Sequence, residues 1–253
     1  MSNLEVAKAA ALAAGGEILA IYGSADFGVE AKSDDSPLTL ADKRAHKVIM
    51  EHLEPTGIPV LSEEGRELPY EDRKAWSQFW LVDPLDGTKE FIKRNGEFTV
   101  NIALIEDGRP VMGVVYAPVL DDLYWGDADG AYLEEQGEQR SIAVAQSLGD
   151  GEVLKVVASR SHRSEELEAW LAALPAHECH AIGSSLKLCQ VASGDAHVYP
   201  RIGPTMEWDT GAAHAVVLAA GGEVVDLDGQ ALQYNKENLL NPYFIVKSGV
   251  SYE

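Results

Sequence analysis

One ten-residue stretch, Trp80–Lys89 (WLVDPLDGTK), constrains this chain more than any other part of it. An apolar run rich in β-forming residues ends at Asp83, which predicts a buried strand that delivers a carboxylate to its own end. Pro84 lacks an N–H and fixes φ, so we expect the strand to stop there. Asp86 lies three residues after Asp83, and a tight bend between them can turn both carboxylates and the Leu85 carbonyl toward one point.

Three hard oxygen donors at one point suit Mg²⁺, Mn²⁺ or Ca²⁺ better than a soft metal. Gly87 allows close backbone approach, and Gly87–Lys89 supplies free N–H groups, a hydroxyl and an ammonium that can cradle an anion. A metal ion beside an anion-binding loop is typical of enzymes that transfer or hydrolyse phosphoryl groups. Asp-Pro and Asp-Gly pairs are also common turn formers, so the stretch alone leaves an ordinary turn open.

The charge balance narrows the classes of partner. The 253 residues carry 20 Lys and Arg against 41 Asp and Glu, a net charge of −21. This excess of acid argues against binding of nucleic-acid polymers or anionic membranes through bulk charge. It would also repel a phosphate substrate, unless bound divalent metals reverse the sign locally.

The cysteines and the hydropathy pattern predict a cytoplasmic protein. Cys179 and Cys189 show no CxxC spacing and no disulfide framework, which favours a reducing compartment. The first residues show no signal-peptide pattern, and no apolar run reaches transmembrane length. Association with the inner face of the cell membrane stays open, as does the oligomeric state, for which we favour a monomer.

The chain divides softly near residue 150. With 46% hydrophobic residues it can build one large core or two closely joined ones. Ser147–Gly151 is the best linker candidate, so we expect an N-terminal α+β half, residues 1–150, and a C-terminal half, residues 151–253. Strand and helix patterns alternate in the second half, which predicts a layered α/β arrangement.

Further polar residues follow predicted strands or begin predicted helices, and each also has an ordinary structural explanation. Glu63 follows a strand over 58–61 and can be an exposed turn residue, although two successive strands ending in carboxylates favour a shared site. Asp42 in a first helical turn and Asp209 before a small-residue helix suit helix N-termini. Gly183–Lys187 opens a helix, where small hydroxyl residues form either an anion site or simple caps.

Three separated motifs together resemble the signature of the inositol monophosphatase superfamily of metal-dependent, lithium-sensitive phosphatases. They are Ser62-Glu63-Glu64, Asp83-Pro84-Leu85-Asp86-Gly87-Thr88, and Trp208-Asp209-Thr210-Gly211-Ala212-Ala213 with Ala220-Gly221-Gly222. The run Trp80–Phe98 is similar to a narrower group, the bacterial CysQ-type 3′(2′),5′-bisphosphate nucleotidases. Gly183–Lys187 and Tyr199–Pro204 match that group as well. Met206-Glu207, before Trp208, departs from the pattern.

The resemblance implies a layered αβαβα sandwich of the inositol monophosphatase and fructose-1,6-bisphosphatase type, and it assigns roles to individual residues. The implied metal ligands are Glu63, Asp83, the Leu85 carbonyl, Asp86 and Asp209. The implied catalytic residues are Thr88 with Asp42 behind it, which orient and deprotonate the attacking water, together with Glu63. The implied contacts to the scissile phosphate are Gly87, Thr88 and Lys89. The implied contacts to the rest of a nucleotide are Ser185, Lys187 and Arg201 at its second phosphate and His162 near its base.

The function implied in this way is hydrolysis of the 3′-phosphate of adenosine 3′,5′-bisphosphate to AMP, with two or three Mg²⁺ ions, in sulfur metabolism. Activity on the sulfonucleotide PAPS stays open. An inositol monophosphatase on the same metal core is the alternative, and a non-catalytic acidic Ca²⁺-binding protein is the distant one.

Overall fold

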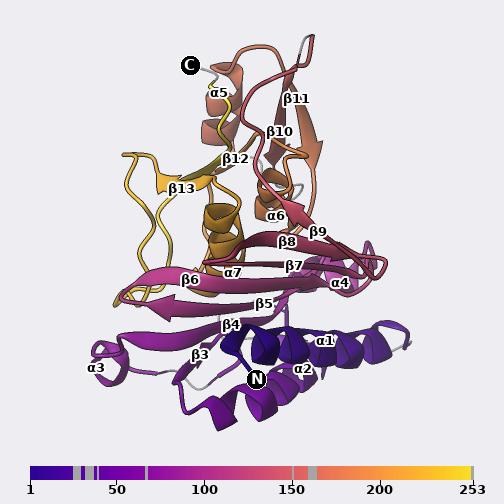
Figure 1. The fold of residues 1–253 in the computed structure, drawn as a ribbon, viewed down its shortest axis with the longest axis vertical. Coiled ribbons are helices and arrows are strands. Elements are labelled where there is room, and N and C mark those ends of the chain that lie inside the picture. The colour runs from indigo at the N-terminus through magenta and orange to yellow at the C-terminus, as the bar shows by residue number, and fades with distance from the viewer. Residues whose placement is uncertain are drawn as a thin grey trace.

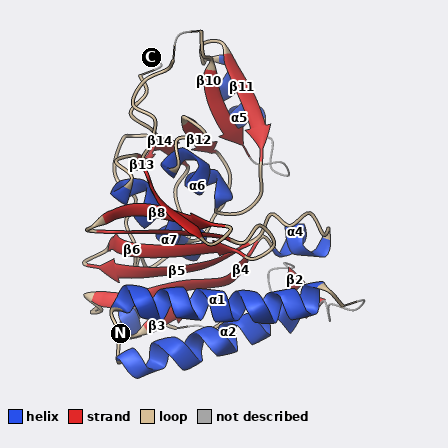
Figure 2. Cartoon of the chain, turned by 45° about the vertical axis from the view of Figure 1, so that its right-hand side comes forward, coloured by secondary structure: helices blue, strands red, loops and turns tan. Residues whose placement is uncertain are grey.

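The computed structural model describes residues 1–24, 30–31, 37–38, 40–65, 68–149, 151–158 and 164–251. Two sheets lie one above the other with helices below, between and beyond them (Figure 1, Figure 2). The layers run helix, sheet, helix, sheet, helix, so the αβαβα sandwich expected from the resemblance is confirmed.

The larger sheet has seven strands in sequence order, β3-β4-β5-β6-β7-β8-β9. Its strands are β3 (Val60–Ser62), β4 (Gln78–Asp86), β5 (Thr99–Glu106), β6 (Arg109–Ala117), β7 (Asp122–Asp127), β8 (Gly130–Glu135) and β9 (Glu138–Ile142). Only the β3–β4 pair is parallel. On its outer face lie α1 (Asn3–Tyr22) and α2 (Leu40–Leu53), whose buried alanines and isoleucines pack against Trp80, Val82 and Ile102.

The smaller sheet has the order β11-β10-β12-β14-β13. Its strands are β10 (Leu154–Ala158), β11 (His177–Ala181), β12 (Val198–Arg201), β13 (Glu223–Asp226) and β14 (Phe244–Lys247). Between the sheets lie α6 (Leu186–Ala192) and α7 (Glu207–Ala219), and α5 (Glu165–Ala172) covers the far face. The short elements are β1 (Glu30–Ala31), β2 (Pro37–Leu38), the 3₁₀ turn η1 (Glu54–Thr56), α3 (Tyr70–Arg73) and α4 (Thr88–Ile92).

Close backbone contact seats α7 on the larger sheet. A Cβ at Gly113 of β6 would lie 2.0 Å from the Ala212 carbonyl oxygen, and one at Gly126 of β7 would lie 2.8 Å from the Ala219 side chain. These strand glycines and the small residues of α7 therefore fit each other. The fit holds the start of α7, which carries Asp209, against the sheet that carries Asp83.

The prediction that β4 stops at Pro84 is wrong. The strand continues to Asp86, but its register with β5 shifts: Asp83 pairs with Asn101, and Asp86 pairs with Thr99. Three steps on β4 thus face two on β5, which is a β-bulge, and a bulge accommodates a proline that has no N–H to donate. The extra residue re-aims the acidic side chains without ending the strand.

The start of α7 also differs from the expectation. The helix begins at Glu207, with Met206 as its N-cap residue, so Asp209 lies in the first turn and is not the cap. Its Oδ2 accepts a hydrogen bond from the Met206 N–H at 2.9 Å. Strand β9 and the short helices α3 and α4 were not predicted.

Candidate active site

Three carboxylates from distant parts of the chain meet where β3 and β4 end and α7 begins. Glu63, Asp83 and Asp209 each offer an oxygen, and these oxygens lie within 4.8 Å of one another. The Glu63 N–H donates to the Val82 carbonyl at 3.1 Å, which fixes this residue beside the bulge. Asp83 is only 1% exposed. An all-oxygen donor set fits a hard divalent cation such as Mg²⁺.

The crowding of these acids changes their acidity. Burial, followed by the charges of Glu63, Asp86 and Asp209, raises the pKa of Asp83 well above its ordinary value. Burial and the neighbouring Asp86 raise the pKa of Asp209 to about 8. Groups that resist ionisation next to one another are the groups that a divalent cation would stabilise.

Asp86 lies at the edge of this cluster and belongs to a hydrogen-bond network. Its Oδ2 accepts from the Ser185 hydroxyl at 3.0 Å. The same hydroxyl oxygen lies 2.8 Å from the Asp209 carbonyl oxygen and 2.9 Å from Asn101 Nδ2. One serine thus connects Asp86, at the end of β4, with Asp209, at the start of α7.

The predicted pairing of Thr88 with Asp42 is present. The Thr88 hydroxyl lies 3.3 Å from Asp42 Oδ1 and 3.3 Å from the Leu85 carbonyl oxygen. Gly87, with φ of +92°, turns the chain from β4 into α4 and so places Thr88 there. Asp42 is 1% exposed on α2.

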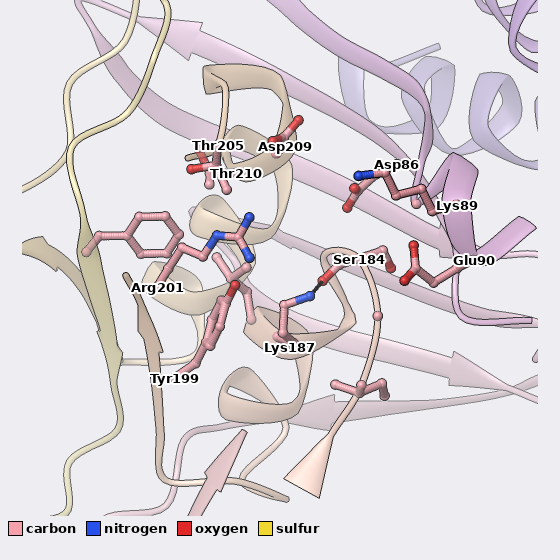
Figure 3. Close-up of a pocket in the computed structure, with 15 residues that line it drawn as sticks. Asp86, Lys89, Glu90, Ser184, Lys187, Tyr199, Arg201, Thr205, Asp209 and Thr210 are labelled. Atoms are coloured by element: carbon pink, nitrogen blue, oxygen red, sulfur yellow. Dashed lines mark hydrogen bonds between the residues drawn. The ribbon is translucent and has the colours of Figure 1, made fainter. Parts of the chain in front are cut away.

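A pocket extends from the acidic cluster toward two basic residues (Figure 3). Its lining includes the predicted site residues Asp86, Gly87, Lys89, Lys187, Arg201 and Asp209. Lys187 on α6 is 6% exposed and donates to the Ser184 carbonyl at 2.6 Å. Burial lowers the pKa of Lys187 to about 8, although Asp86 opposes this shift. Arg201, at the end of β12, donates to the Pro204 carbonyl at 2.7 Å.

Two of the predicted substrate contacts stand apart from this pocket. His162 lies outside the described residues. Ser185 is 1% exposed and is not among the residues that line the pocket, whereas its neighbour Ser184 is. The Ser184 hydroxyl is buried and has no hydrogen-bond partner among the described residues, and its φ is +46°. A strained residue with an unpartnered hydroxyl in a pocket suggests a ligand contact.

Sequence reasoning included Ser184 in the run that opens a helix but assigned the substrate contact to Ser185, because the two are the same residue type and only the fold shows which one lines the pocket. It missed Asn101, which lies in the β-rich run 99–105 and carries no pattern of its own. The local departure at Glu207 was noticed, but its partners lie too far along the chain to be found by spacing.

Glu207 binds the chain segment that supports the first turn of α7, where Asp209 lies. Its carboxylate is fully buried and accepts hydrogen bonds from the Asn235 N–H at 2.7 Å, the Lys236 N–H at 3.0 Å and the Lys236 ammonium at 2.6 Å. Arg73, on α3, donates to Asn235 Oδ1 at 2.9 Å and to the Lys236 carbonyl at 2.7 Å. Residues 235 and 236 are therefore joined to α3 and to Glu207, so they support the first turn of α7.

These features define a class of protein: two layered sheets bring acidic oxygens together for a divalent cation, beside a pocket lined by the cationic side chains Lys89, Lys187 and Arg201. The sequence model of the inositol monophosphatase family matches residues 2–249. The chain belongs to the inositol monophosphatase family, whose members depend on a metal, typically Mg²⁺.

Several relatives of high identity within this family share one name. The chain is 52% identical over 237 residues to the 3′(2′),5′-bisphosphate nucleotidase CysQ of Salmonella typhimurium, covering 92% of this chain and 94% of that one. It is 51% identical, over the same shares, to the CysQ of Escherichia coli K12. The crystal structure of CysQ from Bacteroides thetaiotaomicron superposes with a TM-score of 0.88 at 46% identity, covering 98% of this chain and 97% of that one.

No helix among the described residues combines the length and the apolar character needed to cross a membrane.

Proposed function

We propose that this protein removes the 3′-phosphate of adenosine 3′,5′-bisphosphate, giving AMP and phosphate, in a reaction that depends on Mg²⁺. The observation that carries the proposal is the pocket. Its lining combines Asp86 and Asp209, which belong to or border the acidic cluster, with buried Lys187 and with Arg201, so one ligand can meet both a cation centre and a cationic pair. A substrate with two phosphates matches that arrangement, and the names of the closely similar relatives agree with it.

The chain's own residues suggest a division of work. Glu63, Asp83, Asp86, Asp209 and the Leu85 carbonyl would hold the cations, of which we propose two or three. When bound, Mg²⁺ would supply a water acidified enough to attack at neutral pH and positive charge for the leaving oxygen. The Thr88 hydroxyl has a single hydrogen. It can donate to Asp42 and present its oxygen lone pairs to the attacking water, which orients that water and accepts its hydrogen bond.

Different residues of the pocket would contact the two phosphates and so give specificity. Gly87, the N-cap residue of α4, and Lys89, in its first turn, would hold the phosphate that is cleaved. Lys187 and Arg201 would bind the second phosphate. A buried cation that lacks its anionic partner is costly, so a substrate with one phosphate would bind less well. We retain His162 as the proposed contact near the base.

Phosphate release from a small panel tests the proposal. The panel contains adenosine 3′,5′-bisphosphate, 3′-AMP and inositol 1-phosphate, each with Mg²⁺, with EDTA, and with Mg²⁺ plus Li⁺. We expect the bisphosphate to have the highest kcat/KM, with activity lost in EDTA and inhibited by Li⁺. Inositol 1-phosphate turnover at a comparable rate would favour an inositol monophosphatase instead. Absence of phosphate release from every substrate with Mg²⁺ would favour a non-catalytic cation-binding protein.

Several finer points belong to the same proposal. We propose that PAPS is also a substrate, and that the protein acts as a monomer in the cytoplasm, with peripheral contact to the inner membrane face as an option to test by fractionation. We also propose that the chain divides near residue 150, with most metal ligands in residues 1–150 and Asp209 and the second-phosphate contacts in residues 151–253.

A further inference from the structure

The Ser185 hydroxyl occupies the junction of four elements. Ser185 is the N-cap residue of α6, and its oxygen lies 3.0 Å from Asp86 Oδ2 at the end of β4. It also lies 2.8 Å from the carbonyl oxygen of Asp209 on α7 and 2.9 Å from Nδ2 of Asn101 on β5. Ser185 and Asn101 are each 1% exposed.

A count of donors and acceptors shows that this hydroxyl is fully engaged as a donor. A serine hydroxyl has one hydrogen and two acceptor lone pairs. The Asn101 amide donates to one lone pair, and Asp86 Oδ2 and the Asp209 carbonyl both require the single hydrogen. A phosphate oxygen also needs a donor, so Ser185 could bind phosphate only by releasing one of these two acidic residues.

The neighbouring serine has the opposite environment. The Ser184 hydroxyl is buried in the pocket lining and has no partner among the described residues. Two adjacent hydroxyls therefore differ in what they can do: one is free to meet a ligand, and the other is committed to the acidic residues.

Asn101 strengthens this interpretation, because its own environment is unfavourable. Its Oδ1 is buried without a partner among the described residues, and an unsatisfied buried acceptor destabilises a fold. Asn101 is also the residue opposite Asp83 in the β4–β5 ladder. A polar residue that lowers stability, yet lies between Asp83 and the Ser185 hydroxyl, is better explained by a role in the site than by packing.

We propose that Ser185, oriented by Asn101, is a positioning residue for the cation site and not a contact to the substrate's second phosphate. The hydroxyl fixes the Asp86 carboxylate relative to the start of α7, so that oxygens from β4 and from α7 keep the spacing that a shared cation needs. This inference rests on the proposed metal-dependent function and replaces the role that the resemblance implied for Ser185.

Direct cation binding without substrate provides the test. Mn²⁺ serves as the probe, and its free concentration is followed by electron paramagnetic resonance for the wild-type protein and for Ser185→Ala, Ser185→Thr and Asn101→Ala. Loss of a group that orients a metal ligand typically lowers metal affinity about 10–100-fold. We expect Ser185→Ala to raise the Kd for Mn²⁺ in that range, Asn101→Ala to raise it in the same direction, and Ser185→Thr, which keeps the hydroxyl, to restore affinity to within about threefold of wild type.

Ser184→Ala is the matched control, since it removes an adjacent hydroxyl of the same size. We expect it to leave the Kd for Mn²⁺ within about twofold of wild type and to raise KM for the bisphosphate at saturating Mg²⁺. Ser185→Ala at saturating Mg²⁺ should instead keep the wild-type KM.

The outcomes separate this inference from the proposed function. Wild-type Mn²⁺ affinity in Ser185→Ala and Asn101→Ala, with KM raised in Ser185→Ala, would overturn the positioning role and leave the metal-dependent function standing. A wild-type protein that binds no Mn²⁺ would overturn the cation centre itself and this inference with it.

Discussion

Replacement of Asp209 by asparagine should stabilise the metal-free protein while removing its response to Mg²⁺. Burial and the neighbouring Asp86 raise the pKa of Asp209 from 3.8 to about 8. A carboxyl whose pKa is raised by folding contributes full stability below pH 3.8, and that contribution is lost as the pH rises toward 8. The substituted asparagine would carry no charge at any pH, and its side-chain oxygen can still accept the hydrogen bond from the Met206 N–H.

The size of the effect follows from the pKa values. Between 3.8 and pH 7 the difference is 3.2 pH units, and at about 1.36 kcal/mol per unit this amounts to about 4 kcal/mol. At pH 5 the difference is 1.2 units, or about 2 kcal/mol. Asp209→Asn should therefore exceed the wild type in free energy of unfolding by about 4 kcal/mol at pH 7 and by about half of that at pH 5.

Urea unfolding in EDTA at the two pH values measures this difference, and repetition with Mg²⁺ measures the metal response. Mg²⁺ should stabilise the wild type and have little effect on the variant, because ligands that bind only the folded state raise its stability. Asp228→Asn is the control, since it removes a carboxylate from an exposed position outside the cluster. A variant less stable than the wild type at pH 7 in EDTA, or a difference that does not change between pH 5 and pH 7, would refute the reasoning.

Three further expectations concern the rest of the site. Thr88→Ala should lower kcat by about 100-fold or more, because general acid–base assistance contributes at least that much. Thr88→Ser keeps the hydroxyl near Asp42 and should retain most of the activity. Steady-state kinetics with the bisphosphate measure both variants. Burial lowers the pKa of Lys187 to about 8, so its charge is lost as the pH rises above that value. The preference in kcat/KM for the bisphosphate over 3′-AMP should therefore fall above pH 8 in the wild type and persist in Lys187→Arg. An unchanged preference in the wild type would contradict the role of Lys187. Glu207→Gln should lower the free energy of unfolding by about 3–5 kcal/mol, because it leaves the Lys236 ammonium without its buried partner, and urea unfolding of this variant beside the exposed-site variant Glu237→Gln measures the loss.

Periodicity and turn chemistry predicted most of the fold. The Asp107-Gly108 pair, for example, predicted the β5–β6 hairpin, and both residues adopt the positive φ that such a turn requires. The end of β4 was mispredicted because proline was treated as a stop signal. Proline also fits a bulge, and a bulge depends on the partner strand, which local sequence does not specify. The layer order came from the resemblance and not from the patterns, since long-range packing decides it.

In the candidate site, too, local motifs predicted individual residues, whereas long-range packing decided which of them meet. Asp83 and Asp86 were predicted from one short motif, and the meeting of Glu63 with Asp83 follows from adjacent parallel strands. The approach of Asp209 depends on how α7 seats on Gly113 and Gly126, which are far away in sequence. Which of Ser184 and Ser185 lines the pocket depends on the backbone, in which Ser184 has a φ of +46°, and the local sequence does not specify it.

The net charge of −21 would repel a phosphate substrate, and the acidic cluster adds to that repulsion at the site itself. In their ionised forms, Glu63, Asp83 and Asp209 would repel one another and a phosphate, so the crowding that raises the pKa values of the two aspartates also opposes substrate binding in the metal-free protein. A bound divalent cation would remove both effects at once. Cation binding should therefore precede substrate binding. The same arrangement of carboxylates then destabilises the metal-free protein and allows the metal-bound protein to bind phosphate. A substitution that removes the destabilising repulsion should therefore also abolish phosphate binding.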